Sequence, residues 1–175
     1  IAGMRAVADT HRRDGRRIGF VPTMGCLHDG HLSLMKIARE QSDILVVSVF
    51  VNPTQFGPGE DFAAYPRDPA RDASMAAHAG ADILFLPDAR EIYPPGHSTT
   101  VDVGPMADIL EGKSRPGHFR GVATVVAKLF NIVRPHVAVF GRKDAQQAAV
   151  IRRMALDLDS GVDIVVAPTV REPDG

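Results

Sequence analysis

The chain has 175 residues, of which 45% are hydrophobic, and its formal net charge is −1. This length suffices for one domain with a sizeable core, and the balanced charge argues against a nucleic-acid binder that works through a strong basic field. No apolar run reaches membrane-spanning length, the start does not resemble a signal peptide, and the single cysteine, Cys26, excludes a disulfide within the chain. We therefore expect a cytoplasmic protein with no nucleic-acid or membrane partner.

The first half of the chain alternates predicted helices and strands. Residues 2–14 carry an apolar stripe at helical spacing, and an apolar run at 18–21 predicts a buried strand. Residues 31–41 predict the next helix. Residues 44–51 are so continuously apolar that we expect a strand buried on both faces, as in a parallel sheet. The Pro/Gly-rich stretch 52–71 lacks periodicity and is longer than most connections, which indicates function or disorder.

The second half continues the same alternation. A short strand is expected at 99–103, followed by a short helix and a polar loop within 105–121. Strands that alternate with helices imply an α/β fold with a doubly wound parallel sheet and helices on both faces. The other expected elements are helices at 70–80, 122–133 and 143–158, and strands at 83–86, 137–140 and 162–167.

Residues 20–32, FVPTMGCLHDGHL, combine a strand end, a glycine-containing turn and a helix start. Such a turn points backbone N–H groups and the positive helix end at one spot, which suits a phosphate. Gly25 and Gly30 remove Cβ where a ligand must approach the backbone. His28 and His31 lie three residues apart and share a helix face. Zinc is the alternative for this pair, but no third ligand stands at ligand spacing nearby.

Ligands of doubly wound sheets bind beyond the carboxyl ends of the strands. This rule predicts that four loops lie together at the site: 22–31, 52–67, 112–121 and 141–147. Gln55 offers a donor and an acceptor and suits the orientation of a hydroxy acid. Asn52, directly after a strand, is more readily explained as a residue that caps or turns the chain. Tyr65 and Arg67 either close this loop over the site or are solvated.

The last two loops are polar and basic. Lys113, Arg115, His118 and Arg120 form either an anion lid over a triphosphate or a flexible basic loop. The segment 141–147, GRKDAQQ, opens a helix after a strand. Gly141 permits close approach to the backbone, and Lys143 can reach phosphate oxygens. Asp144 can accept hydrogen bonds from ribose hydroxyls. Gln147 follows one turn later and faces the same way as Lys143. Ordinary exposed polar residues on a helix are the alternative.

Five motifs in one order resemble the pantothenate synthetase (pantoate–β-alanine ligase) family: PTMGCLHDGH, FVNPTQF, YPRD, SRPGHFRGVATVVAKLFN and GRKDAQQ. HDGH is similar to the HxGH signature of the nucleotidylyltransferase superfamily, and the other motifs select this member. The resemblance covers nearly the whole chain and implies a Rossmann-like domain over 1–175 that binds nucleotide and pantoate. The implied reaction joins pantoate and β-alanine to give pantothenate through a pantoyl adenylate, with Mg²⁺-ATP converted to AMP and pyrophosphate.

The resemblance also implies roles for single residues. His28, His31 and Lys143 would be catalytic, with His31 the usual proton donor. The implied ATP-binding residues are Met24, Gly25, Cys26, Leu27, His28, Asp29, Gly30, His31, Gly141, Arg142, Lys143, Asp144 and Val170. The implied pantoate and β-alanine residues are Gln55, Gln147, Asn52, Tyr65, Arg115, Val125, Val126 and Leu129, and no protein metal site is expected.

The sequence departs from the family pattern in two ways. Arg142 and Ala145 stand where acidic or amide and aromatic residues are common. The Ser-Ser-Arg segment and the small C-terminal domain of the family are absent from this chain, so we expect weak or no turnover from it and a natural chain that continues past Gly175. The competing functions are a nucleotide-binding module without turnover, another HxGH nucleotidylyltransferase, and, more remotely, a zinc hydrolase. The family resemblance also implies a homodimer.

Overall fold

Five parallel strands form one sheet in the part of the chain that this computed structural model describes, residues 1–57, 59–60 and 62–171. The order in the sheet is β3-β2-β1-β4-β5, so the chain winds outward from β1 in one direction and then in the other. The order reverses between β1 and β4, which is where such sheets bind ligands. The strands are β1 (Ile18–Thr23), β2 (Ile44–Val49), β3 (Ile83–Phe85), β4 (Val137–Gly141) and β5 (Asp163–Ala167).

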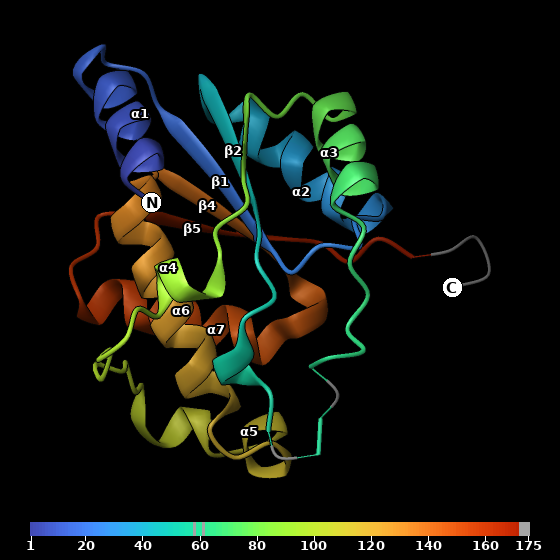
Figure 1. Cartoon of the computed structure of the whole chain (residues 1–175), viewed down its shortest axis with the longest axis vertical. Coiled ribbons are helices and arrows are strands. Elements are labelled where there is room, and N and C mark those ends of the chain that lie inside the picture. Colours follow the sequence, from blue (N-terminus) through green and yellow to red (C-terminus); the bar gives the residue numbers. More distant parts are fainter. Residues whose placement is uncertain (58, 61, 172–175) are drawn as a thin grey trace.

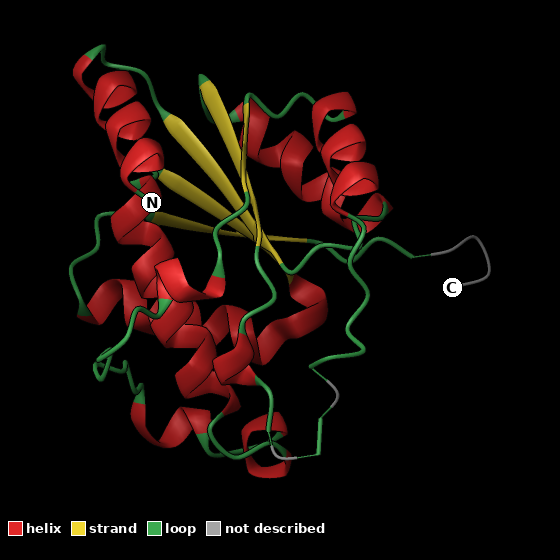
Figure 2. Ribbon diagram, in the orientation of Figure 1, coloured by secondary structure: helices red, strands yellow, loops and turns green. Residues whose placement is uncertain are grey.

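Helices cover both faces of the sheet (Figures 1 and 2). One layer holds α2 (Asp29–Glu40) and α3 (Pro69–His78), and the other holds α1 (Ala2–Arg13), α6 (His118–Val133) and α7 (Ala145–Asp157). The predicted doubly wound α/β fold is confirmed. The shorter helical elements are α4 (Ala89–Ile92), α5 (Glu111–Ser114), η1 (Pro53–Gln55), η2 (Gly104–Ala107) and η3 (Arg142–Asp144).

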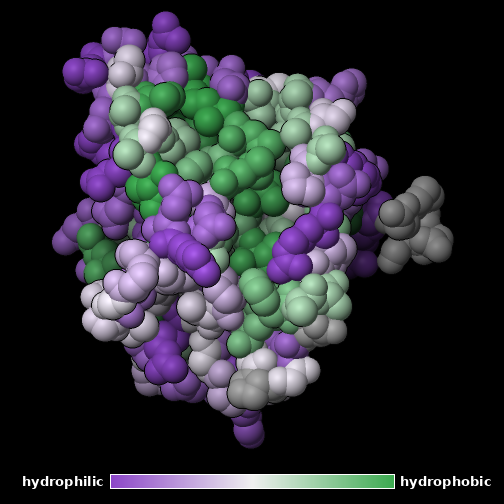
Figure 3. Space-filling view, in the orientation of Figure 1, coloured by the Kyte–Doolittle hydropathy of each residue, from purple (hydrophilic) through white to green (hydrophobic). Residues whose placement is uncertain are grey.

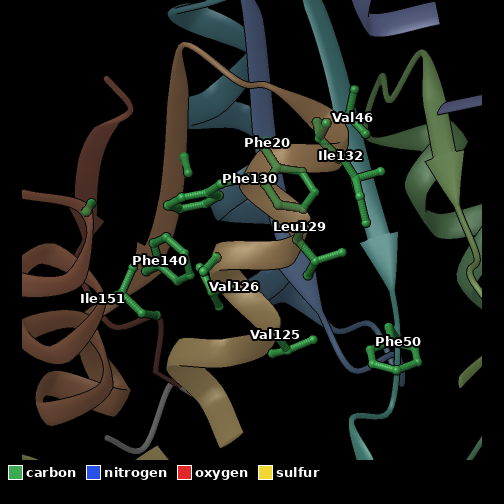
Figure 4. Close-up of a cluster of buried hydrophobic side chains, with 14 of the residues drawn as sticks. Phe20, Val46, Phe50, Val125, Val126, Leu129, Phe130, Ile132, Phe140 and Ile151 are labelled. Carbon is green, nitrogen blue, oxygen red and sulfur yellow. The ribbon is translucent and has the colours of Figure 1, made fainter. Parts of the chain in front are cut away.

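The strands bury alternate side chains in two separate cores. Phe20 and Val46 point to the α6 side, whereas Val21 and Val47 point to the α2 side, and all four are fully buried. On the α6 side, Phe130 makes edge contacts with the rings of both Phe20 and Phe140, each at 6.5 Å between centroids (Figure 4). Burial on both faces explains why β1, β2 and β4 read as continuous apolar runs. Figure 3 shows hydrophobic residues also gathered on the surface of the viewed face, bordered by hydrophilic ones.

The predicted strand at 99–103 is wrong. Its backbone enters no ladder in the described part of the chain; instead the N–H of Val101 donates to the Thr124 hydroxyl at 2.9 Å. Val101 and Val103 pack against the α6 core, so burial against a helix produced the apolar pattern that we interpreted as a strand.

Element boundaries differ by a few residues from those predicted. Helix α6 starts at His118 rather than 122, after Gly117 in the left-handed conformation, and α2 starts at Asp29 rather than 31 because His28 caps it. Strand β2 ends at Val49, two residues early. The expected loop 52–71 contains η1, and its residues 58 and 61 lie outside the described residues.

Candidate functional site

A cavity of about 320 Å³ opens at the carboxyl edge of the sheet, where β1 and β4 end side by side. The ends of β1 and β4 form its floor, the start of α2 and the residues around η1 form two sides, and α6 and α7 close the remainder. It therefore lies at the reversal in strand order that the topology predicts for a ligand. The predicted site residues that line it are Met24, His28, Gly30, His31, Asn52, Gln55, Tyr65, Val125, Val126, Leu129, Gly141, Lys143, Asp144, Gln147 and Val170.

The two histidines cap helix α2 and each other. His28 is the N-cap residue, and its Nδ1 accepts the N–H of Gly30 at 3.1 Å. The Nδ1 of His31 accepts the N–H of His28 at 3.4 Å, and the two ring centroids are 4.1 Å apart. Because each Nδ1 accepts, each neutral ring carries its proton on Nε2, which remains able to donate to an anion. A Cβ on Gly30 would lie 2.8 Å from His28 Cε1, so a larger residue here would displace the capping His28 ring.

Burial keeps His31 neutral. The pKa of His31 is lowered to about 4, chiefly by burial and also by the neighbouring His28 and Lys143, while Asp72 acts in the opposite direction. A neutral imidazole donates a hydrogen bond without the cost of burying a charge. His31 therefore serves the cavity as a directed N–H donor at neutral pH, and the cationic charge nearby comes from Lys143.

A buried carboxylate holds the turn before α2. Asp72, on α3, is 1% exposed, and its two oxygens accept the backbone N–H groups of Cys26 at 3.1 Å and Leu27 at 2.8 Å. A Cβ on Gly25 would lie 2.8 Å from the same carboxylate, which fixes glycine there at φ +90°. Sequence reasoning missed Asp72 because a single aspartate in an amphipathic helix carries no local sign of this long-range contact.

The amide of Gln55 is held in a defined orientation at the cavity wall. Its Oε1 accepts from Asn52 Nδ2 at 3.0 Å, and its Nε2 lies 3.1 Å from the sulfur of Met24. Asn52 is itself 1% exposed, so its amide is largely committed to protein partners. The predicted turn role of Asn52 is confirmed, since its side chain accepts the N–H of Thr54 at 3.3 Å.

The segment after β4 brings three polar side chains to the opposite wall. Gly141 ends the strand, η3 carries Lys143 and Asp144, and Gln147 follows in the first turn of α7. The predicted helix at 143–158 thus begins with one 3-10 turn. Lys143 is near enough to His31 to depress its pKa.

The remaining wall is apolar. Val125, Val126 and Leu129 of α6 are each at most 5% exposed and lie on the face of that helix that also packs against the sheet (Figure 4). The sequence pattern alone would place these residues in the core, because a helix that lines a cavity and a helix that lines a core have the same periodicity. Only the family resemblance implies that they contact pantoate. The lining residues that it missed are Pro22, Thr23, Leu34, Phe50, Val122, Val139, Phe140, Ile151, Pro168 and Thr169.

Some predicted residues lie elsewhere. Leu27 is fully buried in the α2-side core, and Cys26 directs its sulfur to the Pro66 carbonyl at 3.6 Å. Gly25 is enclosed in the turn, and the exposed side chains of Asp29 and Arg142 do not line the cavity. None of these five side chains lines the cavity in this structure, and their roles in ATP binding stay predictions.

Arg115 faces a neighbouring cavity of about 660 Å³. Its guanidinium pairs with Glu60 at 2.6 Å and Glu111 at 2.8 Å, which lowers the pKa of Glu60 to about 2 and raises that of Arg115. His118 contacts the Gln55 carbonyl oxygen at 2.8 Å. The expected anion lid over a triphosphate is thus not what this loop forms here, because its central cation is neutralised by two carboxylates and α5 and α6 order the segment.

The described residues form neither a cluster of three metal-ligating side chains nor a membrane-spanning helix. No group of three or more His, Cys, Asp or Glu side chains comes together there in a way that could hold a metal ion. None of the described helices combines the length and apolarity that a membrane span requires.

Together the fold and the cavity define a class of protein: a doubly wound α/β domain with an HxGH helix start at the reversal point of its sheet. Comparison with known proteins gives the particular family. The family model described as Pantoate-beta-alanine ligase matches residues 1–175, and the chain belongs to this family.

Similar proteins support this assignment. A pantothenate synthetase of Heliobacterium modesticaldum is 63% identical over the whole chain. A crystal structure of pantothenate synthetase from Thermus thermophilus is 52% identical and superposes with a TM-score of 0.93 over 99% of this chain and 62% of that one. A pantoate-beta-alanine ligase from Francisella tularensis, complexed with Beta-gamma ATP and Beta-alanine, is 42% identical with a TM-score of 0.89, over 97% of this chain and 66% of that one. The chain spans 62% of the Heliobacterium protein.

Proposed function

We propose that this chain is the nucleotide- and pantoate-binding part of an ATP-dependent ligase that joins pantoate to β-alanine. The carboxylate of pantoate attacks the α-phosphorus of ATP, and the bond to the bridging oxygen breaks, so that pyrophosphate leaves with the electron pair. The amine of β-alanine then attacks the acyl carbon of pantoyl adenylate, AMP leaves, and the nitrogen loses a proton to give pantothenate. The observation that carries the proposal is one cavity lined by His28, His31, Gln55, Lys143 and Gln147.

The α2 side of the cavity suits the nucleotide's phosphates. The positive end of helix α2 lies at this side of the cavity, and the two histidines, whose Nδ1 atoms accept the His28 and Gly30 N–H groups, add their Nε2–H donors. Lys143, on the other wall, supplies a full positive charge. Negative charge accumulates on phosphate oxygens as the α-phosphorus is attacked, so donors fixed in advance lower the barrier. The same donors hold the phosphate in line with the attacking carboxylate, which adds the benefit of proximity.

The opposite part of the cavity suits a small, branched hydroxy acid. Gln55 and Gln147 offer amide donors and acceptors for a carboxylate and hydroxyl, and the α6 wall of Val125, Val126 and Leu129 suits the geminal methyl groups of pantoate. Another HxGH nucleotidylyltransferase, acting on a phosphorylated alcohol, would require cations where this wall is apolar.

Mg²⁺ enters as part of the substrate, Mg²⁺-ATP. Magnesium in phosphoryl-transfer sites is bound largely by phosphate oxygens and water, with one or two carboxylates. Asp144 is the carboxylate that lines the cavity. We assign it instead to the ribose hydroxyls, beside Gly141, and Val170 to the adenine side.

The test is exchange of labelled pyrophosphate into ATP, measured with this chain in the presence and absence of (R)-pantoate. Exchange that depends on pantoate supports adenylation, and exchange with phosphorylated alcohols but not with pantoate would overturn it. A version extended past Gly175 reports whether the remaining part of the family's length is needed for turnover. An Arg153→Ala variant, with its side chain on the exposed face of α7 and paired to Asp157, is the matched control.

A nucleotide-binding module without turnover is the second candidate. The start of α2 is the observation behind it, since its positive end and its two histidines suit a phosphate whether or not turnover follows. Calorimetry with ATP, beside the exchange assay, separates the two candidates: binding without exchange in the short chain and exchange in the extended chain identify the module.

We also propose a cytoplasmic homodimer, in keeping with the family resemblance and with the single unpaired Cys26. Light scattering coupled to gel filtration of the extended chain tests the oligomeric state. A monomer at micromolar concentration would contradict it.

A further inference from the structure

The hydrogen bonds that hold Gln55 continue away from the cavity, through Asn52 to Tyr93. Asn52 Oδ1 lies 2.8 Å from the Tyr93 hydroxyl, 3.0 Å from the Thr54 hydroxyl and 3.3 Å from the Thr54 N–H. A backbone N–H can only donate, and the Tyr93 hydroxyl donates as well. The two hydroxyls also lie 3.1 Å apart, so the single proton of the Thr54 hydroxyl is shared between Asn52 Oδ1 and the Tyr93 oxygen. This atom is therefore the amide oxygen, and the Nδ2 end of Asn52 points the other way.

The Nδ2 end of Asn52 in turn fixes Gln55. It donates to Gln55 Oε1 at 3.0 Å and to the Gly121 carbonyl at 3.2 Å. A carbonyl can only accept, so the Asn52 amide cannot reverse without opposing two oxygens. The oxygen of Gln55 is thereby turned toward Asn52, and its Nε2 lies beside the Met24 sulfur at the cavity wall. A sulfur is a weak acceptor, which leaves this NH₂ group available to an acid in the cavity.

The backbone around Gln55 has little freedom to compensate. A Cβ on Gly121 would lie 2.3 Å from the Thr54 carbonyl oxygen and 2.8 Å from Gln55 Cα, so α6 and η1 are in direct backbone contact. The His118 ring holds the Gln55 carbonyl from the same side at 2.8 Å. With the main chain fixed, only the orientation of the Gln55 side-chain amide can still change. The relay of hydrogen bonds from Tyr93 through Asn52 to Gln55 favours one of its two orientations.

Tyr93 is well placed to act as the fixed end of this relay. Its ring packs against Phe50 and His97, with centroids 6.4 and 5.0 Å away, and Lys128 Nζ lies 5.6 Å from its centroid. Burial raises the pKa of the Tyr93 hydroxyl, so it remains a protonated donor at neutral pH. It lines the neighbouring cavity rather than the site cavity, and thus has no contact with the substrates proposed above.

We propose that Tyr93 is a positioning residue, which acts through Asn52 to present the NH₂ group of Gln55 to the bound hydroxy acid. The role rests on the proposed function. Without the Tyr93 hydroxyl, Asn52 Oδ1 keeps only its contacts to Thr54, so reversal of the two amides costs less free energy, although the Gly121 carbonyl and the Thr54 N–H still oppose it. Gln55 would then offer its oxygen to the acid for part of the time, and an oxygen repels a carboxylate or competes with it for the same donors.

The test is Tyr93→Phe, which keeps the ring contacts and removes one donor. In ¹⁵N-labelled protein we expect the side-chain amide resonances of Asn52 and Gln55 to shift and broaden. By calorimetry we expect the affinity for (R)-pantoate to fall about fivefold, as for a lost neutral hydrogen bond, with the affinity for ATP unchanged. Selective loss for the acid is a result that general loosening of the fold would not give.

Thr124→Val is the matched control. The Thr124 hydroxyl lies on α6, the helix that carries Gly121, and bonds Val101 N–H and the Arg120 carbonyl, but it contacts neither amide. Unchanged amide resonances in Tyr93→Phe, an unchanged pantoate affinity, or an equal loss in Thr124→Val would overturn the positioning role. If the wild-type chain binds no pantoate, the proposed function fails, and the amide resonances, which need no ligand, still decide whether Tyr93 orients Gln55.

Discussion

The carboxylate of Asp72 accepts the backbone N–H of Leu27 at 2.8 Å, although the two residues are 45 positions apart. Together with the bond to Cys26, this contact ties helix α3 to the turn that carries the HxGH motif. A carboxylate that accepts two N–H groups suits this place because it has acceptors only and both are used. The histidines therefore owe their position to a residue in the second βα unit as well as to their own helix.

Asp72→Asn should loosen this turn. The amide keeps one acceptor but opposes the second N–H with an NH₂ group, so we expect the free energy of unfolding to fall by about 2 kcal/mol. Urea denaturation measures it, and ATP affinity should fall as well. Asp68→Asn is the matched control on the same helix: Asp68 caps α3 by accepting the Arg71 N–H at 3.0 Å, and asparagine caps equally well. Equal stability of the two variants would contradict the role of Asp72.

His31→Ala and Lys143→Ala should each slow adenylation about a hundredfold or more, which corresponds to roughly 3 kcal/mol of lost transition-state stabilisation. Both residues line the cavity, and neither belongs to the two hydrophobic cores, so Lys143→Ala should leave the thermal unfolding midpoint nearly unchanged, and His31→Ala should lower it only by the loss of one capping hydrogen bond. Pantoate-dependent pyrophosphate exchange is the measurement. Lys36→Ala, an exposed position on α2, serves as the control. Exchange at the wild-type rate in either variant would refute the assigned role.

The stability of the chain should depend on pH through His31. Its pKa is about 4 in the fold, against an ordinary value of 6.5, so between these values the unfolded chain binds a proton that the folded chain does not. Stability therefore falls as the pH drops from 6.5 to 4, by on the order of 2 kcal/mol once partial exposure is discounted. In His31→Asn this component should vanish, and parallel pH profiles for the two proteins would contradict it.

ATP binding should be accompanied by proton uptake. A triphosphate beside His31 favours the imidazolium and raises its pKa from about 4 toward its ordinary value. Calorimetric titrations near pH 6 in two buffers of different ionisation enthalpy should show that the protein takes up a fraction of a proton per ATP. The uptake should be lost in His31→Asn. Equal apparent enthalpies in the two buffers would show that His31 does not face the phosphates.

The sequence predicted those parts of the fold and site that depend on local pattern. Apolar runs that alternate with helical patterns were sufficient to predict the five strands of the sheet. The rule that ligands bind at the carboxyl ends of parallel strands was sufficient to place His31, Gln55, Lys143 and Gln147 in one cavity. Arg115 instead lies at the neighbouring cavity, where it pairs with Glu60 and Glu111. These pairings depend on loop geometry, which a periodic sequence pattern does not encode.

Contacts between distant segments were beyond such reasoning. Asp72 and Tyr93 act on the site through hydrogen bonds that span 45 and 41 residues, and neither stands in a motif that signals it. The strand predicted at 99–103 failed for a related reason. Its apolar residues are buried by α6, and a sequence pattern shows that residues are buried but not what buries them.

The hydroxyls of Thr23 and Ser48, near the ends of β1 and β2, test how much a buried polar group contributes to the free energy of unfolding. Thr23 Oγ1 donates to the Ser48 carbonyl at 2.9 Å and accepts the Gly25 N–H at 3.1 Å, whereas the fully buried Ser48 Oγ has no hydrogen-bond partner among the described residues. Thr23→Val should cost about 1–2 kcal/mol of unfolding free energy, because it leaves a buried N–H and a carbonyl unsatisfied. Ser48→Ala should be neutral or stabilising by up to about 1 kcal/mol, since it removes an uncompensated hydroxyl of nearly the same shape. Urea denaturation of both variants decides the matter: a loss in Ser48→Ala as large as that in Thr23→Val would mean that the Ser48 hydroxyl does have a partner in solution.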